Sequence, residues 1–101
     1  MTFIQIVSFR CSDPSALREI EEEWLAATEG RRTLLRETVL VDRTDPAHFV
    51  TINEFESYES AMVNSTLRET DEMARAVAGL LIGEPTYFDL DVLQATEFEQ
   101  R

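Results

Sequence analysis

The side chains of this sequence that could do chemistry are few and far apart. The chain has one cysteine, Cys11, and one histidine, His48. Cys11 has no base near it in the sequence, so we interpret it as an inert small hydrophobe. His48, beside Pro46, is interpreted as a turn-edge residue. Asp89 and Asp91 alternate on one strand face but lack a third ligand nearby. No serine–histidine–aspartate arrangement and no glycine-rich phosphate loop is visible, and we expect no metal and no cofactor.

Asn64 needs an explanation, because it interrupts the apolar stripe of a predicted helix and a buried amide requires a hydrogen-bond partner. It could point into a pocket and bind a substrate oxygen. Alternatively, Asn64 and Ser65 could cap a break in the helix and satisfy its free backbone groups. Trp24 presents a similar choice between core and pocket wall. Asn53 could face a pocket or form a hydrogen bond across the sheet.

The elements that must position these residues follow the order strand, helix, strand, strand, helix, strand. The predicted strands cover residues 3–9, 33–42, 48–55 and 86–93. Asp13 and Pro14 predict the start of the first helix, as N-cap and first helical residue, and Gly30 predicts its end. Asp45-Pro46 predicts the turn between the second and third strands.

The second helix is predicted to start at its cap, Ser57, and to break near Ser65, where Thr66 and Glu69 have the spacing of a capping box. The element order predicts an α+β fold, a ferredoxin-like βαββαβ domain whose four-stranded antiparallel sheet has both helices on one face.

The strands of this sheet have apolar residues on both faces. Val39 and Val41, for example, are predicted to face oppositely to Leu34 and Leu40. Helices on one side would leave the second face bare, and the simplest cover is another copy of the same sheet, related by a two-fold axis. We therefore expect a homodimer.

Composition indicates one small globular domain over residues 1–101, with a polar tail from about residue 95. Of the 101 residues, 44% are hydrophobic, enough for a core. The net charge of −11 argues against nucleic acid and anionic membrane partners. No apolar run approaches the ~18 residues of a membrane span, and the N-terminus lacks a signal-peptide pattern. We expect a cytoplasmic protein.

Nearly the whole chain resembles a known family. A strand ending in an aromatic residue, then Glu-Ser, then an acidic amphipathic helix with a central Asn is typical of the antibiotic-biosynthesis-monooxygenase-like (ABM) domains of the dimeric α+β barrel superfamily. The resemblance extends over residues 2–94 and is carried mainly by residues 49–57, Ala61, 63–65 and 88–92. It implies subunits that pair into a dimeric α+β barrel. The second strand departs from the family, since it opens with Arg31-Arg32 rather than Gly-Cys or Gly-Phe.

The resemblance implies a cofactor-independent monooxygenase acting on a small aromatic or polycyclic metabolite. In such members the substrate itself reduces oxygen, and the pocket supplies orientation, desolvation and proton transfer. Their pocket has an Asn and a Trp on the third strand, and a Tyr and an Arg on the second helix. The matching positions here are Thr51, Phe55, Ala61 and Arg75, so only the Arg is retained. Tyr58, one helical turn before Ala61, could replace the tyrosine.

The expected site lies between the sheet and the second helix. Its catalytic candidates are Asn64, Arg75 and Tyr58, and its substrate-binding candidates are Trp24, Thr51 and Phe55. For Arg75, the alternative is an exposed ion pair with Asp71 or Glu72.

Haem-degrading members bind iron through a histidine on the second helix, which has none here, so haem degradation is not expected. A non-catalytic dimeric module for small-molecule binding or stress response is the alternative function, favoured by the loss of three of the four pocket groups.

Overall fold

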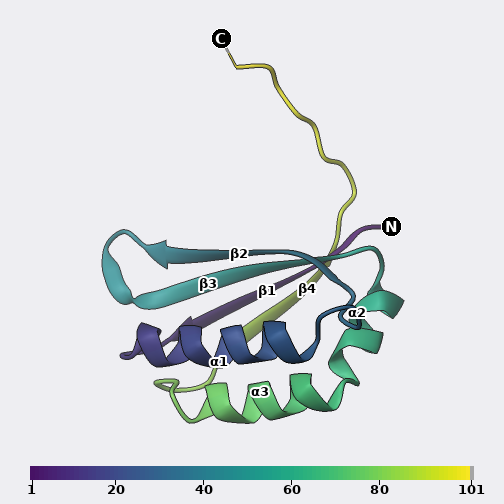
Figure 1. Ribbon diagram of the computed structural model, residues 1–101. Coiled ribbons are helices and arrows are strands. Elements are labelled where there is room, and N and C mark those ends of the chain that lie inside the picture. The colour runs from purple at the N-terminus through teal and green to yellow at the C-terminus, as the bar shows by residue number, and fades with distance from the viewer. Residues whose placement is uncertain (101) are drawn as a thin grey trace.

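The computed structural model describes residues 1–100 and has the predicted order of elements, with the second helix split in two (Figure 1). The elements are β1 (Phe3–Arg10), α1 (Pro14–Ala27), β2 (Leu34–Asp42), β3 (Asp45–Phe55), α2 (Tyr58–Ser65), α3 (Arg68–Ala78) and β4 (Thr86–Asp91). All strand pairs are antiparallel, in the order β2-β3-β1-β4. The fold is therefore the predicted ferredoxin-like α+β arrangement. Within residues 1–100, no helix is long and apolar enough to span a membrane. Arg101, the last residue of the predicted tail, lies outside the described residues.

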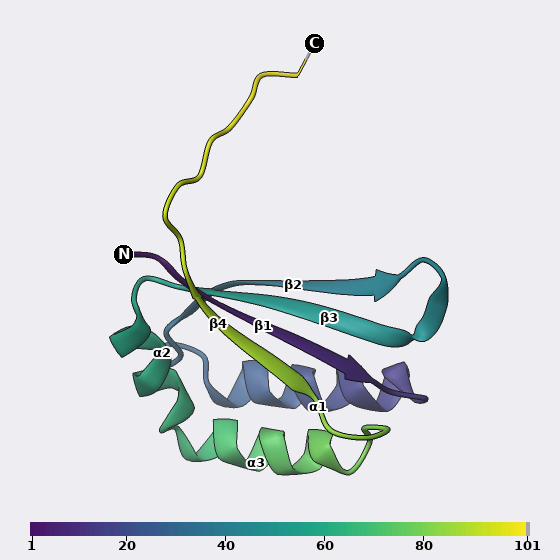
Figure 2. The same cartoon turned by 180° about the vertical axis from the view of Figure 1, so that it is seen from behind.

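The helices form one layer and the sheet forms the other. Figure 1 and Figure 2, seen from opposite sides, both place α1 and α3 side by side on one face of the sheet, with α2 at one end. The other face has no helix over it. The chain after β4 extends away from both layers.

Both predicted helix starts are confirmed. The Asp13 carboxylate accepts a hydrogen bond from the Ala16 backbone N–H at 3.1 Å, and Pro14 is the first residue of α1. The Ser57 hydroxyl oxygen accepts one from the Ser60 N–H at 3.1 Å at the start of α2. Each cap satisfies an N–H that has no partner within its helix.

The predicted break in the second helix is also confirmed, but its capping differs from the prediction. The Thr66 hydroxyl donates to the Val63 carbonyl at 2.7 Å, so it closes α2. Glu69 pairs instead with Arg31, and α3 has no side-chain cap. The predicted capping box between Thr66 and Glu69 is therefore wrong, because each side chain has another partner.

The hairpin between β2 and β3 turns at Arg43-Thr44, two residues before the predicted Asp45-Pro46. The Asp42 carboxylate accepts hydrogen bonds from the Thr44 N–H at 2.9 Å and from its hydroxyl at 2.8 Å. This local bonding closes a two-residue loop. Asp45 and Pro46 belong to β3 instead.

A register irregularity near the start of β2 changes its predicted faces. Leu34 pairs with Phe55, and Val39 pairs with Thr51, which lies four residues from Phe55 on the same face of β3. Leu34 therefore shares a face with Val39, contrary to prediction, because the extra residue of a bulge shifts the alternation by one. Leu40 lies on the opposite face, as predicted.

The core lies between the sheet and the helices, where Phe3, Phe55 and Ala61 are buried and Leu34 packs against them. The face without helices carries an apolar patch, and the exposed side chains in it include Leu40, Phe88 and Leu90 at 42–48% exposure. By strand register, the patch consists of Ile4, Ile6, Leu40, Val50, Ile52, Phe88 and Leu90. We call this set the bare-face patch.

Candidate functional site

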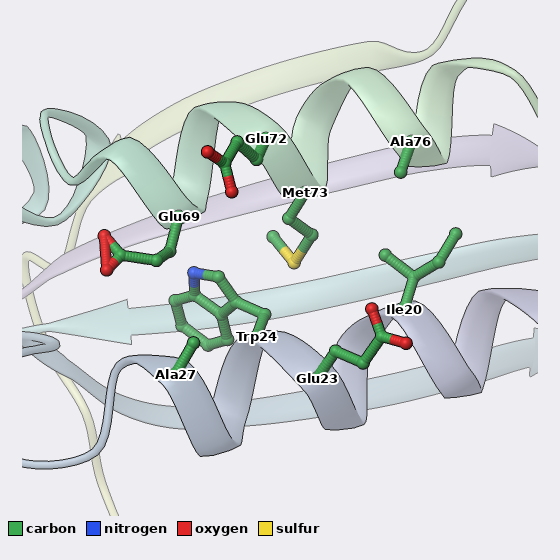
Figure 3. A pocket seen from close by; sticks show the side chains of 8 residues that line it. All are labelled: Ile20, Glu23, Trp24, Ala27, Glu69, Glu72, Met73 and Ala76. Carbon is green, nitrogen blue, oxygen red and sulfur yellow. The ribbon is translucent and has the colours of Figure 1, made fainter.

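A groove of about 200 Å³ lies between α1 and α3 (Figure 3). Its residues recur every three or four positions along both helices, so one side of each helix faces the other. The apolar side chains of Ile20, Trp24 and Met73 point into the space between the helices. The full lining is Ile20, Glu23, Trp24, Ala27, Glu69, Glu72, Met73 and Ala76. We call this cavity the α1–α3 groove.

Trp24 is held rigidly in this groove. Its indole Nε1 donates a hydrogen bond to Thr70 Oγ1 on α3 at 2.9 Å, and the residue is only 5% exposed. The Arg32 guanidinium lies 5.9 Å from the ring centroid, within the range of a cation–π contact. The fully buried Thr28 donates its hydroxyl to the Trp24 carbonyl at 2.7 Å. These contacts fix the position of the indole, which reaches the groove only by a small exposed edge.

Three carboxylates line the groove together with Trp24. Glu69 pairs with Arg31, and the hydrogen bond from that guanidinium lowers the pKa of Glu69, so this carboxylate is ionised near neutral pH. Glu72 has an exposed partner, Arg68, at 3.5 Å, and Glu23 has no ion pair among residues 1–100. The groove therefore repels anions and offers acceptors to hydroxyl groups.

Of the six residues expected to form a site, only Trp24 lines this groove. Phe55 is buried in the core, with its ring centroid 6.2 Å from that of Phe3. Tyr58 also contacts Phe3, edge to face at 5.4 Å, and is half exposed. Thr51 lies on the helix-facing side of β3. The structure thus brings Phe55 and Tyr58 together around Phe3, apart from the groove lining.

Asn64 connects two elements. It is 7% exposed, and its side-chain Oδ1 accepts the backbone N–H of Thr33 at 3.1 Å. The Thr33 hydroxyl donates to the Ser60 carbonyl at 2.6 Å. These bonds join α2 to the chain entering β2. At the helix break, the free backbone carbonyl of Met62 is satisfied instead by Ser65, whose hydroxyl donates to it at 2.9 Å.

Arg75 points away from the groove. Its side chain is 80% exposed and lies 2.9 Å from the Asp71 carboxylate, one helical turn earlier. This is the ion pair considered as the alternative for this residue, and it leaves Arg75 outside the groove lining.

Asn53 has an unusual environment on the helix-facing side of β3. Its Oδ1 atom is buried, and no donor within residues 1–100 reaches it. Its strand partner Gln5 donates instead to Asp89 on the far strand, at 3.2 Å. A buried amide oxygen without a protein partner is a candidate contact for a ligand between sheet and helices.

The sequence did not reveal Glu69, Glu72 and Ala76 as lining residues. Their signal is the helical spacing of residues 69, 72, 73 and 76 on one side of α3. Which helix faces which cannot be read from that spacing alone.

Comparison with known proteins gives matches among solved structures only; no family model and no curated protein matches the chain. SnoaB from Streptomyces nogalater, described as a cofactor-independent oxygenase, aligns with a TM-score of 0.74 and 16% identity, over 93% of this chain and 95% of SnoaB. An antibiotic biosynthesis monooxygenase aligns with a TM-score of 0.74 and 17% identity, over 93% and 100% of the two chains. Rv0793 from Mycobacterium tuberculosis aligns with a TM-score of 0.78 and 14% identity, over 96% and 100%. The chain has the fold of the antibiotic biosynthesis monooxygenase (ABM) domain proteins.

Proposed function

We propose that this chain is a cofactor-independent monooxygenase that oxidises a small aromatic metabolite in the α1–α3 groove. The fold shared with SnoaB supports the reaction class. The observation that carries the proposal is the fixed indole of Trp24 beside carboxylate acceptors in a groove of about 200 Å³. That volume is below the roughly 300–1,000 Å³ of typical ligand pockets. It therefore favours a substrate of one or two rings over a larger polycyclic one.

The lining suits a neutral phenol better than a phenolate, because Glu23, Glu69 and Glu72 surround the ring position. A phenol O–H would donate to the carboxylate of Glu23 or Glu72. This hydrogen bond raises the electron density of the ring without forming a free phenolate, while the exposed edge of Trp24 packs against the ring. Ile20 and Met73 supply apolar wall to the groove.

The overall reaction balances without a further reductant. A naphthol and one O₂ give a naphthoquinone and one water. One oxygen atom becomes the new carbonyl, and the other leaves as water with the two hydrogens that the substrate loses. The substrate supplies all the electrons, and the protein supplies orientation and a proton acceptor.

We also propose that two copies of the chain pair through the bare-face patch. The seven residues of the patch are uncharged. The pair of Arg36 with Glu54 at 3.5 Å borders the patch beside Ile4, and the pair of Arg10 with Asp45 lies towards the other end of β1, so the charges next to the patch are balanced. Because each chain carries a net charge of −11, an uncharged contact surface allows two copies to meet without burying like charges. This pairing would leave both helical layers, and both grooves, on the outside.

A non-catalytic binding module is the second candidate. The outward position of Arg75 and the alanine at position 61 favour it, because two of the groups expected to handle protons or charge are then missing from the interior. The two candidates differ in one observable. The oxygenase consumes O₂ when a naphthol is added, whereas the binding module takes up the naphthol without consuming O₂.

A further inference from the structure

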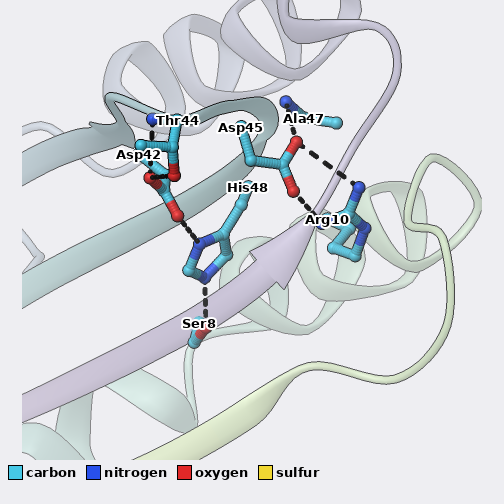
Figure 4. A network of polar contacts seen from close by, with 7 residues as sticks. All are labelled: Ser8, Arg10, Asp42, Thr44, Asp45, Ala47 and His48. Atoms are coloured by element: carbon cyan, nitrogen blue, oxygen red, sulfur yellow. Dashed lines mark hydrogen bonds and ion pairs between the residues drawn. The ribbon is translucent and has the colours of Figure 1, made fainter.

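Ser8, His48 and Asp42 form a chain of hydrogen bonds on the sheet face that has no helices (Figure 4). His48 Nε2 lies 2.8 Å from Ser8 Oγ, and His48 Nδ1 lies 2.9 Å from Asp42 Oδ2. The three residues come from β1, β3 and β2, which are adjacent in the sheet. The expectation that the chain has no serine–histidine–aspartate arrangement is therefore wrong, because strand pairing assembles one.

The bonding around Asp42 fixes the tautomer of His48. Asp42 accepts hydrogen bonds from His48 and from the N–H and hydroxyl of Thr44, and these lower its pKa to about 2. An ionised carboxylate can only accept, so His48 Nδ1 must carry the proton in this contact. In a neutral imidazole, Nε2 is then the acceptor, and the Ser8 hydroxyl donates to it. This is the polarity that a general base needs next to a nucleophile.

Ser8 also borders a hollow of about 340 Å³, large enough for a small ester. Thr86 on β4 is the strand partner of Ser8 on β1, and Arg10 lies two residues further along β1 on the same face. The Thr86 hydroxyl is a donor that could stabilise a developing oxyanion, whereas the Arg10 guanidinium is paired with Asp45 at the edge of the hollow. Ile82 and Glu84 complete the polar-edged wall, and the Ile82 N–H donates to the Arg10 carbonyl at 2.8 Å, which fixes that wall to β1.

We propose that Ser8, His48 and Asp42 form a hydrolytic site for small carboxylic esters, separate from the α1–α3 groove. Ser8 Oγ attacks the ester carbonyl carbon and its proton passes to His48 Nε2. The bond from carbon to the alcohol oxygen breaks, and Nε2 returns the proton to the departing alkoxide. Water then attacks the acyl–Ser8 ester with His48 as base, which releases the acid and restores the serine hydroxyl. The sum is ester plus water giving acid plus alcohol.

This site and the α1–α3 groove lie on opposite faces of the sheet, so either can fail without the other. In the proposed pairing of two chains, the second sheet would border the hollow beside Ser8 and shield it from bulk water, which strengthens electrostatic interactions there.

The test uses the full-length protein with p-nitrophenyl acetate. All nine basic side chains of the sequence are arginines, so acylation of lysine gives no background. We expect p-nitrophenol release to fall about 100-fold or more in Ser8→Ala and in His48→Gln. Ser12→Ala, which removes an exposed serine four residues away, should retain the wild-type rate. Equal rates for wild type and Ser8→Ala would overturn the proposal.

A second measurement needs no variant and therefore remains decisive if Ser8→Ala does not fold. A fluorophosphonate probe reacts with activated serines, and peptide mass spectrometry locates the adduct. We expect the adduct on Ser8, with labelling abolished when the protein is unfolded in urea. An unlabelled Ser8 in the folded protein would show that the three residues only tie β1, β2 and β3 together, and would overturn the proposal.

Discussion

The indole nitrogen of Trp24 lies 2.9 Å from the hydroxyl oxygen of Thr70. The two residues are 46 positions apart in the sequence, and their contact joins α1 to α3. Thr70→Val keeps the shape of the side chain but leaves the indole N–H without its acceptor. We expect the free energy of unfolding to fall by about 1–3 kcal/mol, as measured by urea denaturation.

Trp24→Phe supplies the other side of a double-mutant cycle with Thr70→Val. If the bond couples the two helices, the double variant should lose less than the sum of the two single losses. Strict additivity would mean that the contact contributes nothing to the packing of α1 on α3.

Asn64 is expected to act on stability rather than on ligand binding. Asn64→Ala leaves the part-buried Thr33 N–H without its acceptor, which should cost about 1–2 kcal/mol in urea denaturation. Arg75→Ala is the comparison, because its exposed ion pair with Asp71 should contribute less than about 1 kcal/mol. Affinity for a naphthol, measured by calorimetry, should be unchanged in Asn64→Ala. A roughly 10-fold loss of affinity with unchanged stability would assign Asn64 to the ligand instead.

Asp42 should make the fold sensitive to acid. Its pKa in the folded chain is lowered from 3.8 to about 2, mainly by the hydrogen bond with His48 and then by the bonds from Thr44. The unfolded chain therefore binds the proton first, and stability from this group is present above pH 3.8 and lost as pH falls through about 2. Unfolding free energies measured between these two pH values should decline less steeply in Asp42→Asn. Parallel curves for the two proteins would contradict the assignment.

The bare-face patch should determine the assembly of the chain. Light scattering of the wild type at micromolar concentration should give about twice the chain mass of 11.6 kDa. Phe88→Glu places a charge in the patch and should yield monomers. Val63→Glu, at a comparably exposed apolar position on α2, should leave the dimer intact. A wild-type monomer across that concentration range would contradict the pairing.

The sequence predicted the element order because each boundary has a local signal. Asp13 and Ser57 each start a helix by accepting a hydrogen bond from a backbone N–H three residues later. Such local bonds can be predicted from the sequence without knowledge of the tertiary structure. The hairpin turn was misplaced because Asp45-Pro46 is a strong turn signal in isolation. Bonding between Asp42 and Thr44 closes the loop earlier.

The candidate sites were much less predictable. Trp24 was identified, but its partners on α3 depend on how two distant helices pack. Ser8 lies 40 residues from His48, and only the register of β1 on β3 brings their side chains to 2.8 Å. Arg75 was selected by its match to a family position, yet helical periodicity alone offers it Asp71 one turn away. Long-range pairing, rather than local propensity, decides the first two cases, whereas the Arg75 pair is local and could have been predicted from helical spacing.

Oxygen uptake tests the central claim most directly. Protein treated with chelator and freed of flavin is mixed with a panel of naphthols, and O₂ consumption is followed together with quinone absorbance. We predict one O₂ consumed per quinone formed, and loss of this activity in Ala76→Phe, which fills the α1–α3 groove. Ala74→Phe, on the same helix but outside the groove lining, should remain active and shows that a new aromatic ring is tolerated. Quinone formation no faster than in buffer, or equal in the wild type and Ala76→Phe, would contradict an oxygenase acting in this groove.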